Sequence, residues 1–426
     1  MYHQEFINQL ALKWTNRLEQ EKQWKLPNVP QQSHFFKEWV LPFQNRKERI
    51  FVIISDALRY EVAHELFTKL NTERKGSTQI DCIQGVIPSF TALGMAALLP
   101  HKNIAYENNQ VLVDGMRVSS TKERGNLLKT YDPEAIAVQY YDIPRERKKF
   151  RELFQKKSII YIYHNVIDAT GDNVHTERDV FQSAEQAIEE IKDLINRLVN
   201  NVSAANILIA ADHGFLYQRE RVAREQKVPF SVEEVLYKNR RSMITSKRYE
   251  IEGTLTFPMN EENNLYVTIP KGINRFSLPG KGINYVHGGA MVQEIAIPVI
   301  TFKNVRSASS ENDVTHVEVK LTSATRIITN EITYLTFVQT EKVEDKRRPI
   351  RLRLYLEDEK GERVSNENII IADSTSSNPA ERTYREKFVL REMDYDRSKT
   401  YYLVLAYDKE QIDKVYARYP FTIDIP

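Results

Sequence analysis

Residues 49–70, RIFVIISDALRYEVAHELFTKL, decide the fold class. Residues 50–54 form a continuous apolar run, which is typical of a strand buried on both faces of a parallel sheet. Residues 58–70 then show helical periodicity, so the strand delivers Asp56 to its carboxyl end just before a helix. Open α/β sheets bind their ligands at the carboxyl ends of the strands. The stretch therefore predicts an α/β fold with a polar site beside Asp56.

Three later segments repeat this pattern. SIIYIYHNVID (158–168) and NILIAADHGF (206–215) each place an acidic residue at the end of an apolar run, and EIAIPVITF (294–302) predicts a fourth strand. A long helix is expected over residues 180–199. Strands that alternate with helices predict a mostly parallel sheet flanked by helices.

The flanks of this core differ in character. Residues 1–44 predict a helical N-terminal segment followed by a proline-containing linker. The core extends over residues 45–306, and within it the irregular segment 225–280 is interpreted as a cap or insertion over the site. Seven short alternating runs between residues 307 and 426 predict a β-sandwich of immunoglobulin-like type, with a binding or spacing role.

The composition bounds the class of protein. Lys and Arg number 60 against 58 acidic residues, so the total charge does not direct the chain to nucleic acid, although a local basic groove can. The single cysteine, Cys82, excludes an internal disulfide and a cysteine-based zinc site. No apolar segment approaches the ~18 residues of a membrane span, and the N-terminus lacks the apolar run of a signal peptide. We expect a cytoplasmic protein without a membrane partner.

Acidic and imidazole side chains gather at the predicted strand ends. Such groups suit two divalent ions, which at about 4 Å separation bind the attacking and leaving oxygens of a phosphoryl transfer. Taken singly, each motif has an ordinary structural explanation, such as a helix N-cap or a tight turn. Taken together they favour a two-metal phosphoryl-transfer site, built from Asp56, Thr91, Asp168, Asp172, Asp212, His213 and His287.

The order of these residues resembles the alkaline phosphatase superfamily. Five phrases are more particular and resemble the PglZ family, in its type A members from bacterial BREX phage-defence systems: ISDALRYE, PSFTALGMAALLP, HNVIDATGD, ADHGFLY and YVHGGAMVQEIAIPV. The resemblance covers about residues 45–303 and implies an alkaline-phosphatase-like core. PglZ proteins are usually longer, so we expect this chain to be the C-terminal part of a longer protein.

The resemblance also implies roles for the site residues. One metal would be held by Asp168, Asp172 and His287, and the other by Asp56, Asp212 and His213. Zinc is the first expectation. Many superfamily members have His where this chain has Asp172, and the additional carboxylate hardens that group, so manganese and magnesium are alternatives.

Thr91 is the expected nucleophile. It falls in the first turn of a predicted helix for which Ser89 is a natural N-cap, so the helix dipole would favour an alkoxide there. Ser89 is the alternative nucleophile, with Thr91 as the cap.

Three functions are compatible with these residues. The first is a metal-dependent phosphodiesterase or nuclease of a BREX system, with DNA or a nucleotide diester as substrate. Arg275 and the basic cluster that includes Arg240 and Arg241 would then contact substrate phosphates. The second is a phosphomonoesterase acting on a small metabolite. The third is a scaffold that docks a DNA methyltransferase or another BREX subunit.

Overall fold

The computed structural model consists of two compact units. It describes residues 2–21, 23–73, 76–219, 223–230, 232–260, 264–279, 284–304, 314–408 and 415–425. The first unit comprises Met1–Leu70 and Gly76–Arg306, and the second comprises Asn71–Lys75 and Ser307–Pro426. Each unit has its own hydrophobic core.

A six-stranded sheet forms the centre of the first unit. In spatial order its strands are β2 (Ser77–Gln84), β17 (Ala296–Lys303), β8 (Asn206–Ala210), β1 (Ile50–Ser55), β7 (Ile159–His164) and β6 (Ile136–Gln139). The last four run parallel, and β17 pairs antiparallel with both β8 and β2. All residues of β1, β7 and β8 are buried. The prediction of a mostly parallel sheet is therefore confirmed.

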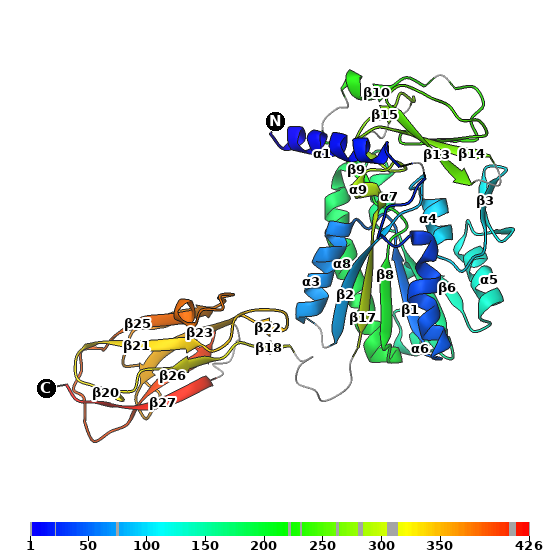
Figure 1. The fold of residues 1–426 in the computed structure, drawn as a ribbon. Coiled ribbons are helices and arrows are strands. Elements are labelled where there is room, and N and C mark those ends of the chain that lie inside the picture. Colours follow the sequence, from blue (N-terminus) through cyan, green and yellow to red (C-terminus); the bar gives the residue numbers. More distant parts are fainter. Residues whose placement is uncertain are drawn as a thin grey trace. The chain divides into compact units, whose positions relative to one another are not determined.

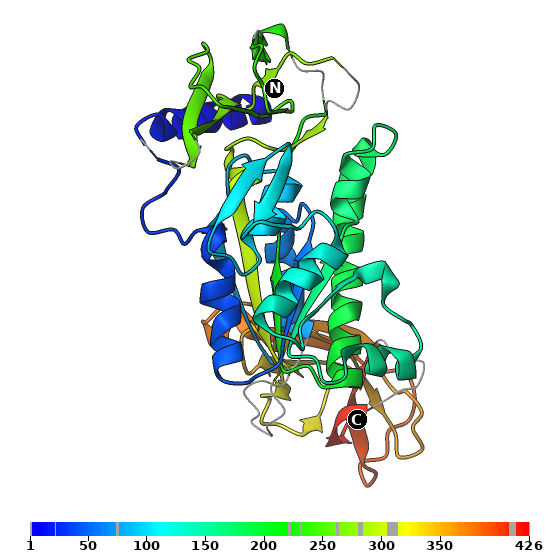
Figure 2. The same cartoon turned by 90° about the vertical axis from the view of Figure 1, so that its right-hand side faces the viewer.

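Helices cover both faces of this sheet (Figures 1 and 2). The predicted long helix is α8 (Val180–Val202), whose buried positions recur at helical spacing and face the sheet. It ends at Ser203, which adopts a left-handed conformation with φ 58°. The other helices of the core are α2 (Leu41–Asn45), α3 (Tyr60–Glu73), α4 (Thr91–Ala97), α5 (Thr121–Tyr131), α6 (Arg147–Phe154), α7 (Ile167–Gly171) and α9 (Val292–Ile295).

Small sheets lie beyond the carboxyl ends of the parallel strands (Figure 1). The segment interpreted as a cap contains a four-stranded antiparallel sheet, in the order β11 (Tyr237–Lys238), β12 (Met243–Thr245), β14 (Leu265–Pro270) and β13 (Thr254–Asn260). Shorter pairings surround it: β10 (Lys227–Val228) with β15 (Arg275–Phe276), β9 (Leu216–Tyr217) with β16 (Tyr285–Val286), and β3 (Ile104–Glu107) with β4 (Gln110–Val113) and β5 (Met116–Arg117).

The N-terminal helix α1 (Tyr2–Leu18) packs against loops of this region. The Trp14 indole donates to the Ala290 carbonyl at 2.7 Å, and the Gly272 amide donates to the Thr15 hydroxyl at 2.9 Å. Ala11 is buried in the same contact. The helix is therefore part of the first unit. In the part of the chain that the structure describes, no helix is long and apolar enough to cross a membrane.

The second unit is a β-sandwich. Its two main sheets contain β19 (Val319–Leu321), β21 (Ile332–Gln339) and β25 (Thr383–Val389) on one side, and β20 (Ile327–Ile328), β27 (Val415–Ile423), β26 (Tyr401–Tyr407), β23 (Ile350–Glu357) and β24 (Asn368–Ala372) on the other. A further pair joins β18 (Thr315–His316) to β22 (Arg347–Arg348). Side chains from both main sheets, such as Phe337 and Leu403, share one core.

Candidate metal centre

The candidate site residues lie where strands end. Asp56 follows β1, Asp212 and His213 follow β8, and His287 follows β16. Asp168 lies in α7, which comes directly after β7. Parallel strands bring their carboxyl ends to the same edge of a sheet, so these side chains can meet although they are far apart in sequence.

Two carboxylates and one imidazole form the first group. The ligand atoms of Asp56, Asp212 and His213 all lie within 4.8 Å of one another, and all three side chains are buried. His213 Nε2 is 3.7 Å from Asp56 Oδ1 and 3.4 Å from Asp212 Oδ2. The other ring nitrogen of His213, Nδ1, is 2.9 Å from the Gly214 carbonyl, which assigns the proton to Nδ1 and leaves Nε2 as the coordinating atom.

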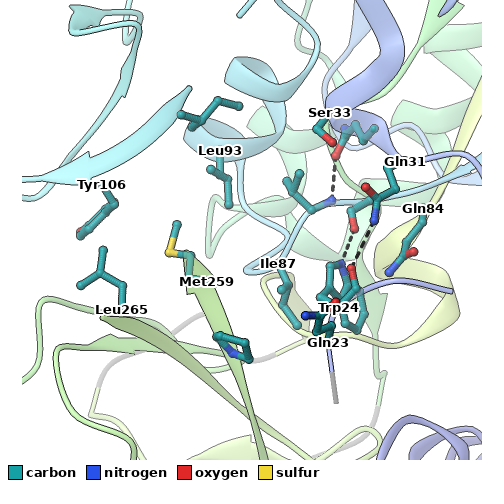
Figure 3. Close-up of a pocket in the computed structure, with 15 residues that line it drawn as sticks. Gln23, Trp24, Gln31, Ser33, Gln84, Ile87, Leu93, Tyr106, Met259 and Leu265 are labelled. Atoms are coloured by element: carbon teal, nitrogen blue, oxygen red, sulfur yellow. Dashed lines mark hydrogen bonds between the residues drawn. The ribbon is translucent and has the colours of Figure 1, made fainter. Parts of the chain in front are cut away.

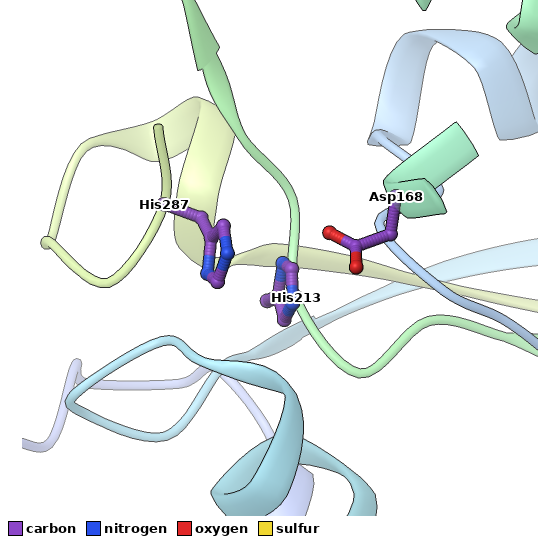
Figure 4. A group of neighbouring side chains, drawn as sticks. All are labelled: Asp168, His213 and His287. Carbon is purple, nitrogen blue, oxygen red and sulfur yellow. The ribbon is translucent and has the colours of Figure 1, made fainter. Parts of the chain in front are cut away.

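The second group shares His213 with the first. Asp168, His213 and His287 also place their ligand atoms within 4.8 Å of one another (Figure 4). The two imidazoles stack, with ring centroids 4.2 Å apart. Asp172 lies at the edge of the group, with Oδ1 3.7 Å from His287 Nε2, and its side chain is more than half exposed. The structure thus groups His213 with Asp168 and His287, while Asp172 borders the group.

Thr91 is the first residue of α4, and its hydroxyl faces the imidazole that the two groups share. Thr91 Oγ1 lies 3.1 Å from His213 Nε2. The expectation that Ser89 caps this helix is wrong, because the N-cap position is Phe90. The Ser89 hydroxyl is buried and donates instead to the Gly289 carbonyl at 2.7 Å. These contacts favour Thr91 over Ser89 as the reactive hydroxyl.

The crowding of acids changes their proton affinities. Burial, followed by the charges of Asp212 and Asp168, raises the pKa of Asp56 well above its usual range. Burial also raises the pKa of Asp168. Burial works against the charged form of His287, but the neighbouring carboxylates of Asp172 and Asp168 outweigh it and raise its pKa to about 9. Without a cation, the site therefore favours protons on these groups.

Unsatisfied atoms test whether metal ions fit the site. Asp56 Oδ1 and Asp212 Oδ2 are buried and have no hydrogen-bond partner among the described residues. A buried carboxylate oxygen without a partner is costly, and a divalent cation is the compensation that such a cluster accepts. Carboxylate and imidazole donors suit zinc, manganese or magnesium in this environment. The donor set therefore fits divalent metal ions.

Several supporting residues were not anticipated. The Tyr285 hydroxyl donates to Asp168 Oδ1 at 2.9 Å. The buried Gln32 side chain donates to the Asp212 carbonyl at 2.7 Å and accepts from the Val86 amide at 3.0 Å. These contacts join residues 54 to 180 positions apart, so local sequence patterns carry no signal for them.

His164 is a second kind of support, close to β1. Its Nδ1 lies 3.2 Å from the Ser55 hydroxyl, its Nε2 lies 2.8 Å from Glu190 Oε2, and its carbonyl accepts from the Asp56 amide at 2.8 Å. His164 is buried, and it holds the backbone that carries Asp56.

The glycine of the Asp-His-Gly motif has a steric explanation. A Cβ on Gly214 would collide with the Gln293 carbonyl, so only glycine allows the two backbones to approach. The Gly214 amide uses this approach to donate to the Glu294 carbonyl at 2.9 Å.

The basic residues of the cap differ in exposure, and Arg241 is not available to a substrate. Arg241 was expected to contact substrate, but it is fully buried and pairs with Glu294, so that expectation is wrong. Arg240 is half-buried and donates to the Leu278 carbonyl at 2.9 Å. Arg275 is 3% exposed, and burial lowers its pKa to about 10. Lys238 and Arg248 are exposed.

A separate pocket of about 330 Å³ lies beside α4 (Figure 3). Leu93 of α4, Ile87, Tyr106, Met259 and Leu265 form much of its wall. Its lining contains no charged side chain and none of the candidate metal ligands. The pocket therefore does not suit a phosphate group, and the metal centre is the better candidate for phosphoryl chemistry.

Sequence comparison assigns the chain to the class of alkaline phosphatase-like proteins. Residues 35–302 match the family described as the BREX system PglZ alkaline phosphatase-like domain. The chain belongs to the PglZ family. Its alkaline phosphatase-like fold implies divalent metal ions, for which Asp56, Asp168, Asp212, His213 and His287 are the candidate ligands.

Two curated relatives match the whole chain. It is 51% identical to the alkaline phosphatase-like protein PglZ of Bacillus cereus (strain H3081.97), covering 51% of that protein, and 34% identical to the alkaline phosphatase-like protein BrxZ of Escherichia coli O9:H4 (strain HS), covering 50% of it. The chain thus spans about half the length of these relatives.

Among solved structures, human ectonucleotide pyrophosphatase / phosphodiesterase 5 is similar at a TM-score of 0.44 and 10% identity, with 60% of this chain and 88% of that chain covered. The murine protein gives a TM-score of 0.43 at 11% identity, with the same coverage.

Proposed function

We propose that this chain is the catalytic part of a metal-dependent phosphodiesterase that acts on nucleic acid in a BREX phage-defence system. The main supporting observation is that the Thr91 hydroxyl contacts the imidazole of His213, which belongs to both ligand groups. A nucleophile beside paired metal sites is the arrangement that in-line phosphoryl transfer needs. Membership of the PglZ family supports the defence role.

The chain's own residues have distinct roles in this reaction. The Thr91 oxygen forms a bond to phosphorus while the bond to the leaving ester oxygen breaks, and water later cleaves the threonyl phosphate ester. In the metal-free protein, Thr91 donates its hydrogen bond to His213 Nε2, which aligns the hydroxyl with both groups. The bound divalent ions would supply Lewis-acid stabilisation of the charge that develops on the phosphoryl oxygens. Zinc is the expected ion, with manganese and magnesium as alternatives.

Hydrolysis of two nitrophenyl esters tests the proposal. We expect bis-nitrophenyl phosphate to be cleaved faster than nitrophenyl phosphate, in a reaction that needs a divalent ion. Thr91→Ala should lower the rate on the order of a thousandfold or more. Thr68→Ala, a change to an exposed threonine of α3, serves as the matched control. Equal rates for Thr91→Ala and the parent would exclude Thr91 as the nucleophile.

Two other functions make different predictions. A phosphomonoesterase with a small metabolite as substrate uses the same metals and nucleophile, so a strong preference for the monoester would favour it. A scaffold for a BREX methyltransferase needs no turnover, so a protein that binds metal but hydrolyses neither ester would favour that role. The unpartnered carboxylate oxygens at Asp56 and Asp212 support a metal ion at this site, which all three functions allow, so the hydrolysis measurements decide among them.

A further inference from the structure

Both candidate metal-binding histidines lie on loops that contact Glu294. His213 precedes β9 and His287 follows β16, and these two strands pair with each other. The ladder therefore holds the two loops on one side. On the other side, the Glu294 carbonyl accepts from the Gly214 amide at 2.9 Å.

The carboxylate of Glu294 binds the loop that follows His287. Its Oε1 accepts from the Gly289 amide at 2.9 Å, and its Oε2 accepts from the Met291 amide at 3.0 Å. One residue thus contacts the loop of each histidine, through its backbone in one case and its side chain in the other. Glu294 lies in the phrase YVHGGAMVQEIAIPV. Within this phrase, only His287 has a role in the proposed reaction.

Arg241 fixes the orientation of this carboxylate. Its Nε donates to Glu294 Oε1 at 3.0 Å and its Nη2 donates to Oε2 at 2.8 Å, so the pair is bidentate. Arg241 also donates to the carbonyls of Gly272 and Asn274. Both side chains of the pair are 0% exposed. The guanidinium therefore has a fixed position before any ion or substrate binds.

The shape of the His287 loop depends on the same guanidinium. The Arg241 guanidinium fills the space that a Cβ on Gly289 would occupy, so glycine is required at that position. The Gly289 carbonyl accepts from the Ser89 hydroxyl at 2.7 Å, two residues before Thr91. The pair is thereby connected to the turn that presents the proposed nucleophile.

We propose that Arg241 and Glu294 are positioning residues, which hold the His213 and His287 loops at the separation that the metal centre requires. This inference rests on the proposed metal centre. A buried ion pair need not be retained for stability, because apolar residues of similar volume often stabilise a fold equally well or better. The pair instead supplies acceptors that two loop amides would otherwise lack, and supporting contacts of this kind typically change metal affinity about 10- to 100-fold.

Two double variants separate positioning from stability. Arg241→Met with Glu294→Leu removes both charges and both acceptor oxygens. Arg241→Met with Glu294→Gln also removes both charges but keeps an amide oxygen that can accept from the Gly289 amide. The control is Leu198→Ala, a cavity in the buried face of α8 that lowers stability away from the loops. The readouts are Zn²⁺ affinity by calorimetry, the visible absorption spectrum of bound Co²⁺, and thermal unfolding in chelator.

We expect the Leu variant to bind Zn²⁺ about 10- to 100-fold more weakly than the parent. The Gln variant should lose less affinity, and Leu198→Ala should lose stability with little change in affinity. Parental affinity in the Leu variant would overturn the proposal. If that variant does not fold, parental affinity and an unchanged Co²⁺ spectrum in the Gln variant would overturn it. These binding measurements use no substrate, so a parent protein that binds metal but hydrolyses neither ester contradicts the proposed function alone.

Discussion

Tyr285 and Asp168 are joined by a hydrogen bond of 2.9 Å across 117 positions of sequence, from the phenol hydroxyl to the carboxylate Oδ1. Both residues are buried. The Tyr285 ring lies where a Cβ on Gly171 would be, so the glycine three residues after Asp168 is needed for this contact. The phenol therefore orients the carboxylate before a metal ion binds.

Removal of this hydroxyl should weaken metal binding. We expect Tyr285→Phe to reduce affinity at the group of Asp168, His213 and His287 by about tenfold or more, because Asp168 loses the donor that orients it. The fold should persist, since phenylalanine keeps the ring against Gly171. Titration calorimetry with Zn²⁺ measures the effect.

Tyr217→Phe provides the matched control for this change. Tyr217 pairs directly with Tyr285 in the β9–β16 ladder. If both variants bind Zn²⁺ as tightly as the parent, the hydrogen bond between Tyr285 and Asp168 has no role in metal binding.

The acid–base properties of His287 predict a pH-dependent stability in the metal-free protein. Its pKa is about 9 in the folded chain against 6.5 for an ordinary histidine. The stabilisation that this shift provides is fully present below pH 6.5 and is lost as pH rises through 9. We expect the chelator-treated protein to unfold at lower temperature at pH 9 than at pH 6.5, and His287→Gln to reduce that difference.

Metal binding should show the opposite dependence on pH. Only the neutral imidazole binds a metal ion, so at pH 7 the ion must displace a proton from His287. The affinity of the protein for the metal ion therefore rises towards pH 9. Calorimetry in buffers of different ionisation enthalpy measures the released proton. A parent protein that releases no more protons than His287→Gln would contradict this assignment.

Three of the four parallel strands were predictable from the sequence because they are continuous apolar runs. Residues 50–54 and the run in 206–210 have this character, and both became strands buried on both faces. The two edge strands, β2 and β6, were not anticipated, because most residues of β2 are exposed or half-buried and all residues of the short β6 are half-buried. The direction of β17 was also not predictable, since an apolar run contains no information on which neighbour it pairs with.

The environment of individual side chains was harder to predict. Arg241 stands in a sequence rich in basic residues, which suggested an exposed groove, yet its partner Glu294 lies 53 positions later. Asp168 was chosen as a ligand from its position after a strand, while its partner Tyr285 could not be recognised before folding. Tertiary pairing, and not local composition, decides whether such residues are exposed.

Asp212 offers a direct test of metal-dependent stability. Its Oδ1 accepts from the Ala57 amide at 3.1 Å, and its Oδ2 is the buried oxygen without a partner. Asp212→Asn should keep the Ala57 contact but weaken the ligand, so hydrolysis should be lost. Saturating Zn²⁺ should raise the unfolding temperature of the parent and raise that of the variant much less. In chelator the unfolding temperatures of the two proteins should differ little. If the variant is generally unfolded, its loss of activity says nothing about the role of Asp212 in catalysis.

Two cations of the cap, Lys238 and Arg240, allow the substrate class to be tested. Lys238 is exposed and Arg240 is half-buried, in and beside β11 of the segment that lies beyond the strand ends. If a nucleic acid passes over this segment, each cation that contacts a phosphate contributes about one unit to the slope of log affinity against log salt. Lys238→Gln with Arg240→Gln should therefore weaken DNA binding and lower that slope by about two units. Arg351→Gln with Arg353→Gln in the second unit is the control for a loss of two positive charges. Equal slopes for both double variants would show that the cap cations do not contact DNA, and would move the proposal towards a small phosphoester substrate.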